Sequence, residues 1–177
     1  IIKNLIINAS IVDINHIILP CLGESSIRNE FSKKNLERQI YKITPLLEKY
    51  DVNLLLETDM EPKLFYKFVN KFKSSKIMIN YDTGNSASLG YDPVEEINLY
   101  GDLIKVVHIK DCKYLGGSTI LGSGDVDFIK VLTSLNKINY SGLIIFQAYR
   151  DKEGIEIFKK QLNWFLKILD DKLSYIT

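Results

Sequence analysis

The sequence has few of the residues that mark disulfide-rich, nucleic-acid-binding or membrane proteins. Its two cysteines, Cys21 and Cys112, form no Cys-x-x-Cys pair and indicate buried or spectator thiols in a reducing cytoplasm. It has two histidines, and 23 basic against 22 acidic residues give a formal net charge of +1. This balance favours neither nucleic acid nor an anionic membrane as a partner. No apolar run approaches the ~20 residues that cross a bilayer, and the N-terminal stretch lacks a signal-peptide layout.

The composition that is present is typical of one globular domain. Apolar residues make up 46% of the 177 residues and charged residues 25%, so we expect a single domain over residues 1–177. The chain begins with Ile1 rather than Met, inside a stretch to about Ile14 whose apolar spacing predicts a helix without an N-terminal cap. We therefore expect that the front of the natural protein is missing.

Four short apolar runs each end in a side chain that can bind a metal ion or carry a proton. These predicted buried strands cover residues 52–57, 77–82, 103–108 and 143–147, and end at Glu57, Asp82, His108 and Gln147. A fifth predicted strand, residues 15–22, comes before them. Each gap between strand ends has room for a loop, a helix and the next strand. This spacing predicts a repeated βα unit.

Amphipathic stretches between these runs predict the helices. One covers Leu36 to Tyr50 and is interrupted by Pro45, and one begins near Pro62 with an apolar face of Leu64, Phe65, Phe68, Val69 and Phe72. Others begin after the capping residues Asp92 and Asp127, and the last runs from about Gly154 to Leu173 with Ile155, Phe158, Leu162, Phe165, Leu166 and Leu169 inward. Loops are predicted directly after Asp82 and over residues 111–124.

Five βα units indicate a parallel sheet that is either covered on both faces or closed into a barrel. An open doubly wound sheet fits the strand count. In a (β/α)8 barrel, however, polar residues at neighbouring strand ends meet at one mouth, whereas an open sheet would spread them along an edge. We therefore expect an α/β fold of the (β/α)8 TIM barrel class, with about its last five βα units, strands 4–8, in this chain.

Several segments resemble a known family. They are Leu54-Leu55-Leu56-Glu57, Asp82-Thr83-Gly84-Asn85, His108-Ile109-Lys110-Asp111, the segment from Leu121 to Phe128, and Tyr140-Ser141-Gly142. In order and spacing they resemble the xylose-isomerase-like barrels of sugar and sugar-phosphate isomerases and epimerases, which also include endonuclease IV. The most similar subgroup that we identify is the hexulose-phosphate 3-epimerases.

The resemblance implies one divalent metal ion, Mn²⁺, Mg²⁺, Co²⁺ or Zn²⁺, at the barrel mouth. Three of the family's ligands fall on Glu57, Asp82 and His108, and the fourth, a glutamate in the family, falls on Gln147. A glutamine can donate its amide oxygen to a metal but cannot accept the substrate proton, and it removes one negative charge. Glu57 is then left as the single base, with Lys110 or Asp111 as a possible second acid or base. Taken singly, Glu57 or Asp82 could instead cap a helix or pair with a neighbouring lysine.

Four further residues are candidates for substrate binding. Asn85 would bind a substrate hydroxyl or close a turn. The backbone amides of Gly122 and Gly124 would hold a phosphate or form a plain turn. Arg150 would bind substrate or a phosphate, unless it makes a surface salt bridge.

Together these features predict a metal-dependent sugar or sugar-phosphate isomerase or epimerase that removes a proton next to a carbonyl and passes through an enediolate. A one-base isomerase or a dehydratase also fits. The alternatives are a catalytically silent barrel that binds a ligand and an endonuclease IV-like phosphodiesterase, which two histidines and the near-zero net charge disfavour. The expected partner is a small carbohydrate, with no nucleic acid or membrane. The family resemblance suggests dimers or tetramers, and exposed strand edges in this fragment would favour self-association.

Overall fold

The computed structural model describes residues 1–173, with side chains described as far as residue 170. The chain divides into two compact units, and the strands β3 and β4 contribute residues to both. The first unit consists of Ile1–Asn80 and Leu103–Lys105, and the second of Tyr81–Asp102 and Val106–Thr177. The predicted single domain over residues 1–177 extends beyond the described residues and stays a prediction. Among the described residues, no helix is both long and apolar enough to cross a membrane.

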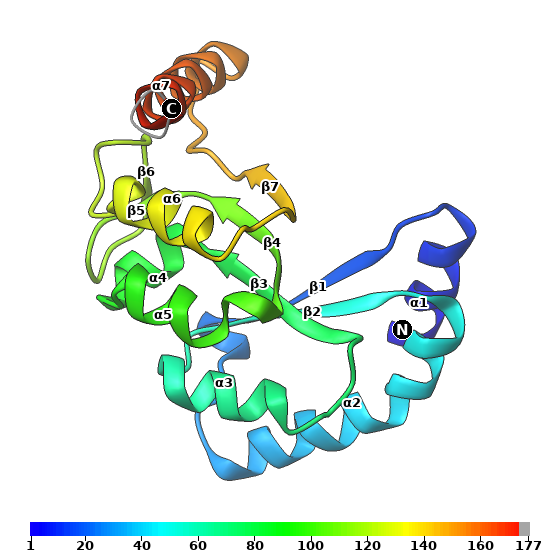
Figure 1. Cartoon of the computed structure of the whole chain (residues 1–177). Coiled ribbons are helices and arrows are strands. Elements are labelled where there is room, and N and C mark those ends of the chain that lie inside the picture. The colour runs from blue at the N-terminus through cyan, green and yellow to red at the C-terminus, as the bar shows by residue number, and fades with distance from the viewer. Residues whose placement is uncertain (174–177) are drawn as a thin grey trace. The chain divides into compact units, whose positions relative to one another are not determined.

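The first unit is built on three parallel strands. Its elements are α1 (Ile2–Ile11), β1 (His16–Cys21), a 3-10 turn (Gly23–Ser25), α2 (Glu30–Tyr50), β2 (Asn53–Thr58), α3 (Pro62–Asn70) and most of β3 (Ile77–Asp82), as labelled in Figure 1. β2 pairs with β1 on one side and with β3 on the other, and Leu56 lies opposite Ile79. Leu54, Leu55 and Ile79 are fully buried. Continuous apolar strands of this kind are typical of parallel sheets covered on both faces.

Helix α2 runs without a break through Pro45, where the sequence predicted an interruption. Proline lacks the N–H that would bond to the carbonyl four residues earlier, so one hydrogen bond is lost there. A capping box at Asn29 and the buried residues Ile40, Ile43 and Leu47 stabilise the helix on both sides of that position. Packing of the apolar face therefore outweighs the local effect of the proline.

Helix α3 has the predicted aromatic face with one correction. Phe65, Phe68 and Val69 are buried, and so is Phe72 just beyond the helix, but Leu64 is 50% exposed. Leu64 precedes Phe65 by one residue, which turns it about 100° around the helix and places it at the edge of the buried stripe. The helix begins at Pro62, as predicted.

The second unit contains most of β4 (Ile104–Ile109), between the end of β3 and β7 (Leu143–Phe146). β4 and β7 are parallel, and His108 lies opposite Ile145. The remaining elements are α4 (Thr83–Leu89), α5 (Pro93–Tyr100), a 3-10 turn (Gly101–Leu103), β5 (Asp111–Cys112), β6 (Ser118–Thr119), α6 (Phe128–Lys137) and α7 (Ile155–Leu173), all shown in Figure 1. Helices α5 and α6 pack against each other.

Two predicted loops of this unit contain regular structure. The segment after Asp82 forms helix α4, because the Asp82 side chain caps its first turn and Gly90 ends it with a φ of 74° in the left-handed region. The segment 111–124 contains the short antiparallel pair of β5 and β6. By contrast, the predicted helix starts after Asp92 and Asp127 are confirmed, and both side chains accept a backbone hydrogen bond from the helix.

Strand β7 is more exposed than its apolar sequence predicted. Leu143, Ile144 and Ile145 are 56%, 43% and 42% exposed, although the run predicts a buried strand. Among the described strands, β7 has β4 as its neighbour on one side and none on the other, so its second edge is unpaired. The exposure follows from this position at the end of the strand order.

Helix α7 buries only part of the predicted face: Phe165 is buried and Leu162 and Leu169 are half-buried, as predicted, but the buried stripe also includes residues that were not predicted. Ile157, Gln161 and Phe165 are buried, whereas Ile155 and Leu166 are exposed. Gln161 occupies this face because both ends of its amide group hydrogen-bond to backbone groups. Hydrophobicity alone does not identify such a polar residue as part of the core.

Candidate functional site

Glu57 lies near the carboxyl end of β2 in the first unit and is 8% exposed. Its Oε2 accepts a hydrogen bond from Nδ2 of Asn80, a buried residue of β3, at 2.6 Å. On the other side of β2, Pro20 of β1 lies opposite Glu57, and a proline side chain has no hydrogen to donate. The carboxylate is therefore buried and held by a neutral donor.

Asp82 lies at the end of β3, in the second unit, and has two separate environments for its two oxygens. Oδ1 accepts the backbone N–H of Asn85 at 2.8 Å and so caps α4. Oδ2 is buried and, among the residues that the structure describes, has no hydrogen-bond partner. A buried anionic oxygen without a donor is costly unless a cation compensates it.

Two nitrogen atoms approach that oxygen without reaching hydrogen-bond distance. Nδ1 of His108, at the end of β4, is 3.8 Å from Oδ2 of Asp82, and Nζ of Lys110 is 3.7 Å from it. Lys110 also donates to Oδ1 of Asn85 at 2.8 Å. The structure thus brings together four of the predicted site residues within one unit.

Thr83 and Gly84 explain why Lys110 lies so close to α4. The Thr83 hydroxyl donates to the Lys110 carbonyl at 2.6 Å and accepts its backbone N–H at 3.1 Å. A Cβ on Gly84 would lie 2.7 Å from Cγ of Lys110, so a larger residue would push the lysine away. The Asp-Thr-Gly-Asn sequence therefore docks the start of α4 on the residues that follow β4.

The carboxylate of Asp111 holds the loop that follows it. Asp111 is 1% exposed, and its carboxylate accepts hydrogen bonds from the backbone amides of Gly122, Gly124 and Val126 at 2.9, 2.8 and 3.2 Å. A side chain at Gly124 would collide with this carboxylate. The amides predicted to hold a phosphate are engaged by an aspartate of the chain itself, and their role in phosphate binding and that of Asp111 as an acid or base stay predictions.

Gln147 and Arg150 lie together beyond the end of β7. The backbone N–H of Gln147 donates to the Ile109 carbonyl at 3.0 Å, which extends the pairing of β7 with β4. Both side chains line a pocket of about 430 Å³ whose other walls include Phe146 and Phe158. The role of Gln147 as a fourth ligand and that of Arg150 in substrate binding stay predictions.

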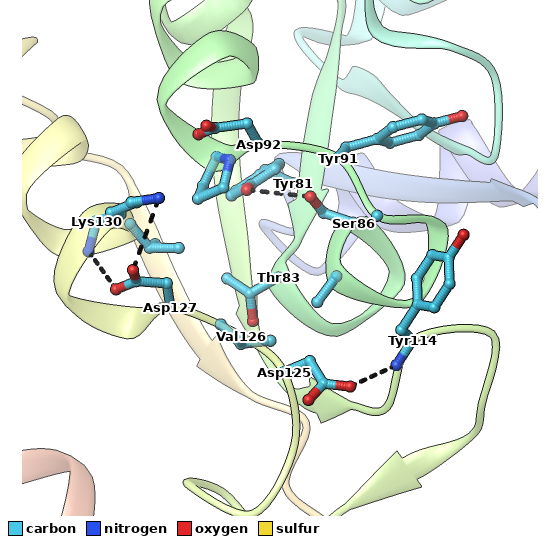
Figure 2. A pocket seen from close by; sticks show the side chains of 14 residues that line it. Tyr81, Thr83, Ser86, Tyr91, Asp92, Tyr114, Asp125, Val126, Asp127 and Lys130 are labelled. Atoms are coloured by element: carbon cyan, nitrogen blue, oxygen red, sulfur yellow. Dashed lines mark hydrogen bonds and ion pairs between the residues drawn. The ribbon is translucent and has the colours of Figure 1, made fainter.

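A second pocket of the same unit, of about 360 Å³, lies outside this group of residues (Figure 2). Its described lining residues come from the end of β3, from α4, α5 and α6 and from the neighbouring loops, and include neither Asp82 nor His108. Asp92 and Asp127 cap α5 and α6, and Asp125 accepts the backbone N–H of Tyr114. These carboxylates stabilise local structure around the pocket.

A buried carboxylate that was not predicted from the sequence is Glu96 of α5, which is 4% exposed. It accepts hydrogen bonds from the hydroxyl groups of Tyr81, Ser86 and Tyr100. Burial raises the pKa of Glu96, and the three hydroxyl donors oppose that rise. No sequence pattern indicates this group, because its members come from β3, α4 and α5. Asn80 was missed as well, although the alternation within β3 places it on the same face as Asp82.

The residues around Asp82 suit a divalent cation. An oxygen of Asp82 and a ring nitrogen of His108 lie within 4.8 Å of each other, close enough to share one ion. Carboxylate oxygen and imidazole nitrogen are the ligands that Zn²⁺ and Mn²⁺ take in proteins. Oδ2 of Asp82, buried and without a hydrogen-bond donor among the described residues, is the atom that such an ion would satisfy.

Comparison with known proteins adds three likenesses. The chain is 25% identical over 155 residues to inosose dehydratase of Clostridium tetani, covering 75% of this chain and 52% of that protein. It is 26% identical over 113 residues to the putative L-ribulose-5-phosphate 3-epimerase SgbU of Escherichia coli K12, covering 56% of this chain and 40% of that protein. The solved structure of the IolI protein with a bound zinc atom is similar with a TM-score of 0.75 and 20% identity, over 90% of this chain and 66% of that one. The chain thus spans about half the length of these curated relatives.

The family model described as "Xylose isomerase-like TIM barrel" matches residues 1–168. This match confirms the predicted family and the TIM barrel class, and the open doubly wound sheet is set aside. The assignment of the five strands to barrel strands 4–8 stays a prediction. The chain belongs to the xylose isomerase-like TIM barrel family.

Proposed function

We propose that the protein is a metal-dependent sugar or sugar-phosphate isomerase or epimerase. The observation that carries this proposal is the buried Oδ2 of Asp82, which lacks a hydrogen-bond donor among the described residues and lies 3.8 Å from Nδ1 of His108. A cation shared by the two groups accounts for both facts. The substrate class follows from the relatives, whose names describe enzymes of inosose and of L-ribulose 5-phosphate.

We propose Glu57 as the third ligand, from its place near the carboxyl end of β2. Support comes from β3, because Asn80, which donates to Glu57, and Asp82 are two residues apart in one strand and share a face. Gln147 is proposed as the fourth ligand through its amide oxygen. With two carboxylates rather than three, the site carries less negative charge for a hard cation.

The proposed chemistry is removal of a proton from the carbon next to a carbonyl. A bound divalent ion would polarise that carbonyl and stabilise negative charge on the substrate oxygens. Glu57 would remove the proton with the oxygen that faces the substrate. Lys110 would return a proton, and Asn85, which holds its ammonium group at 2.8 Å, would orient it. Asp111 takes no part, because three backbone amides engage its carboxylate.

A dehydratase is the second candidate, and Gln147 favours it. Epimerisation with two symmetric bases needs a carboxylate on each face of the substrate, and Gln147 cannot accept a proton. Loss of water next to a carbonyl needs one base and a proton donor for the leaving hydroxyl, which Glu57 and Lys110 could supply. The named inosose dehydratase relative points in the same direction.

The test is the metal content of the protein purified without chelators, together with two histidine variants. We expect about one divalent ion per chain in the wild type and in His16→Ala, and loss of the ion in His108→Ala. His16 is a matched control because it lies at the start of β1 and bonds to Asn15 and Asn53. Absence of metal, even after incubation with Mn²⁺, would overturn the proposal in favour of a ligand-binding barrel.

A substrate screen then separates the two reactions. Ketoses, keto-inositols and their phosphates would be incubated with the metal-loaded protein, and the products identified by mass and by NMR. A product of unchanged mass indicates an epimerase if one stereocentre is inverted, and an isomerase if the carbonyl group has moved. A product that has lost one water indicates a dehydratase.

A further inference from the structure

Asn80 occupies a position that only the pairing of β2 with β3 reveals. Leu56 lies opposite Ile79 in this parallel pair, so the next residues, Glu57 and Asn80, are cross-strand neighbours. Asn80 is 2% exposed, and its Nδ2 lies 2.6 Å from Oε2 of Glu57. All six residues of β3 are buried, which leaves the Asn80 side chain little freedom to turn away.

We propose that Asn80 is a positioning residue that holds Oε2 of Glu57 and directs the other carboxylate oxygen to the metal and substrate. The inference rests on the proposed function, because it concerns how Glu57 is presented there. In this role Asn80 does not bind the ion or the substrate and acts on them through Glu57.

The chemistry of the pair explains why a neutral amide suits this place. With one oxygen tied to an amide, the carboxylate would bind the ion through its other oxygen, whose second lone pair could still accept a proton. A lysine or arginine here would neutralise Glu57 and weaken its attraction for a cation. An aspartate would repel it. Asparagine supplies the hydrogen bond and leaves the charge of Glu57 intact.

A hydrogen bond to Glu57 comes from the β3 side, through Asn80. Pro20 is the residue of β1 opposite Glu57, and its side chain carries no donor. Leu56 and Thr58, the neighbours of Glu57 along β2, point to the opposite face of the strand. Asn80 is therefore the cross-strand neighbour able to fix the rotamer of this carboxylate.

The test measures Mn²⁺ affinity by electron paramagnetic resonance, with the thermal midpoint as a check of folding. Two variants lose the donor but differ in packing: Asn80→Leu keeps the number and branching of the side-chain heavy atoms, and Asn80→Ala leaves a cavity. We expect both to weaken Mn²⁺ binding by about tenfold or more, since partners that orient metal ligands contribute roughly 10- to 100-fold. Tyr81→Phe is the matched control: it removes a buried hydroxyl from the other face of β3 and should leave affinity unchanged.

The outcomes separate this inference from the proposed function. If the wild type binds Mn²⁺ and either folded Asn80 variant binds it equally well, Asn80 does not position Glu57, while the metal site stands. If the wild type binds no Mn²⁺, both proposals fail. A loss of affinity that follows the thermal midpoint across Asn80→Leu, Asn80→Ala and Tyr81→Phe would show general destabilisation and also overturn the inference.

Discussion

The carboxylate of Asp111 accepts hydrogen bonds from three backbone amides of the loop that follows it. Asp111→Asn keeps the volume but removes the charge, and its NH₂ group cannot accept a bond from an amide. Because a hydrogen bond to a charged group contributes roughly 1.5–3 kcal/mol, we predict that the variant lowers the free energy of unfolding by about 2–3 kcal/mol. Urea denaturation measures this change.

Asp127→Asn is the control for that prediction. Asp127 caps α6 through Oδ1, which accepts the Lys130 N–H, and an asparagine oxygen caps a helix equally well. Its free energy of unfolding should stay within about 0.5 kcal/mol of the wild type. If Asp111→Asn has unchanged stability but reduced turnover, the prediction is contradicted and the result supports Asp111 as an acid or base instead.

At the scale of elements, Glu96 connects β3, α4 and α5 through the hydroxyl groups of Tyr81, Ser86 and Tyr100. Burial raises the pKa of Glu96 above its ordinary value of 4.5. Between 4.5 and the raised value, the folded state binds more protons than the unfolded state, so the contribution of Glu96 to stability decreases as the pH rises through this window. We predict that Glu96→Gln gains stability relative to the wild type over the same range.

The measurement is the difference in free energy of unfolding between Glu96→Gln and the wild type, at several pH values from below 4.5 to neutral. Taking the difference cancels the pH-dependent contributions of carboxylates that both proteins share. One of these is Asp125, whose pKa is lowered by its hydrogen bond from the Tyr114 amide. Two parallel stability curves would contradict the prediction. Glutamine suits the comparison because it is uncharged and can still bond to hydroxyl groups.

At the scale of the whole molecule, exposed β7 predicts self-association. Leu143, Ile144 and Ile145 are exposed, and among the described strands β7 pairs on one side only. An apolar strand with a free edge is a template for another strand. We expect the protein to form dimers or larger species in light scattering after gel filtration, and Leu143→Lys to shift it towards the 20.4 kDa of one chain.

Ile11→Lys is the control, because Ile11 is 73% exposed but lies on α1 rather than on a strand edge. The mass measured for Ile11→Lys should equal that measured for the wild type. A wild-type protein of 20.4 kDa at every concentration, with one cooperative thermal transition, would contradict the predicted self-association.

The elements predicted most accurately from sequence are those determined by neighbours along the chain. The strand Ile77–Asp82 was predicted to the residue, because an unbroken apolar run ends there in a polar side chain. The helix starts after Asp92 and Asp127 were also predicted, since a capping bond needs only the next two or three residues. The placing of His108 near Asp82 followed from the rule that polar ends of parallel strands meet.

Features that depend on contacts between distant segments were decided by the tertiary structure. Asp111 lies in the same motif as His108 and Lys110, yet the loop that folds back on it gives it a different role. The burial of Gln161 and the exposure of β7 depend on which segments cover them. The repeated βα order and the polar strand ends could be predicted from sequence, because these are local patterns. The partner of each polar group was decided by folding, because a hydrogen bond across strands or loops depends on the register and path of the whole chain.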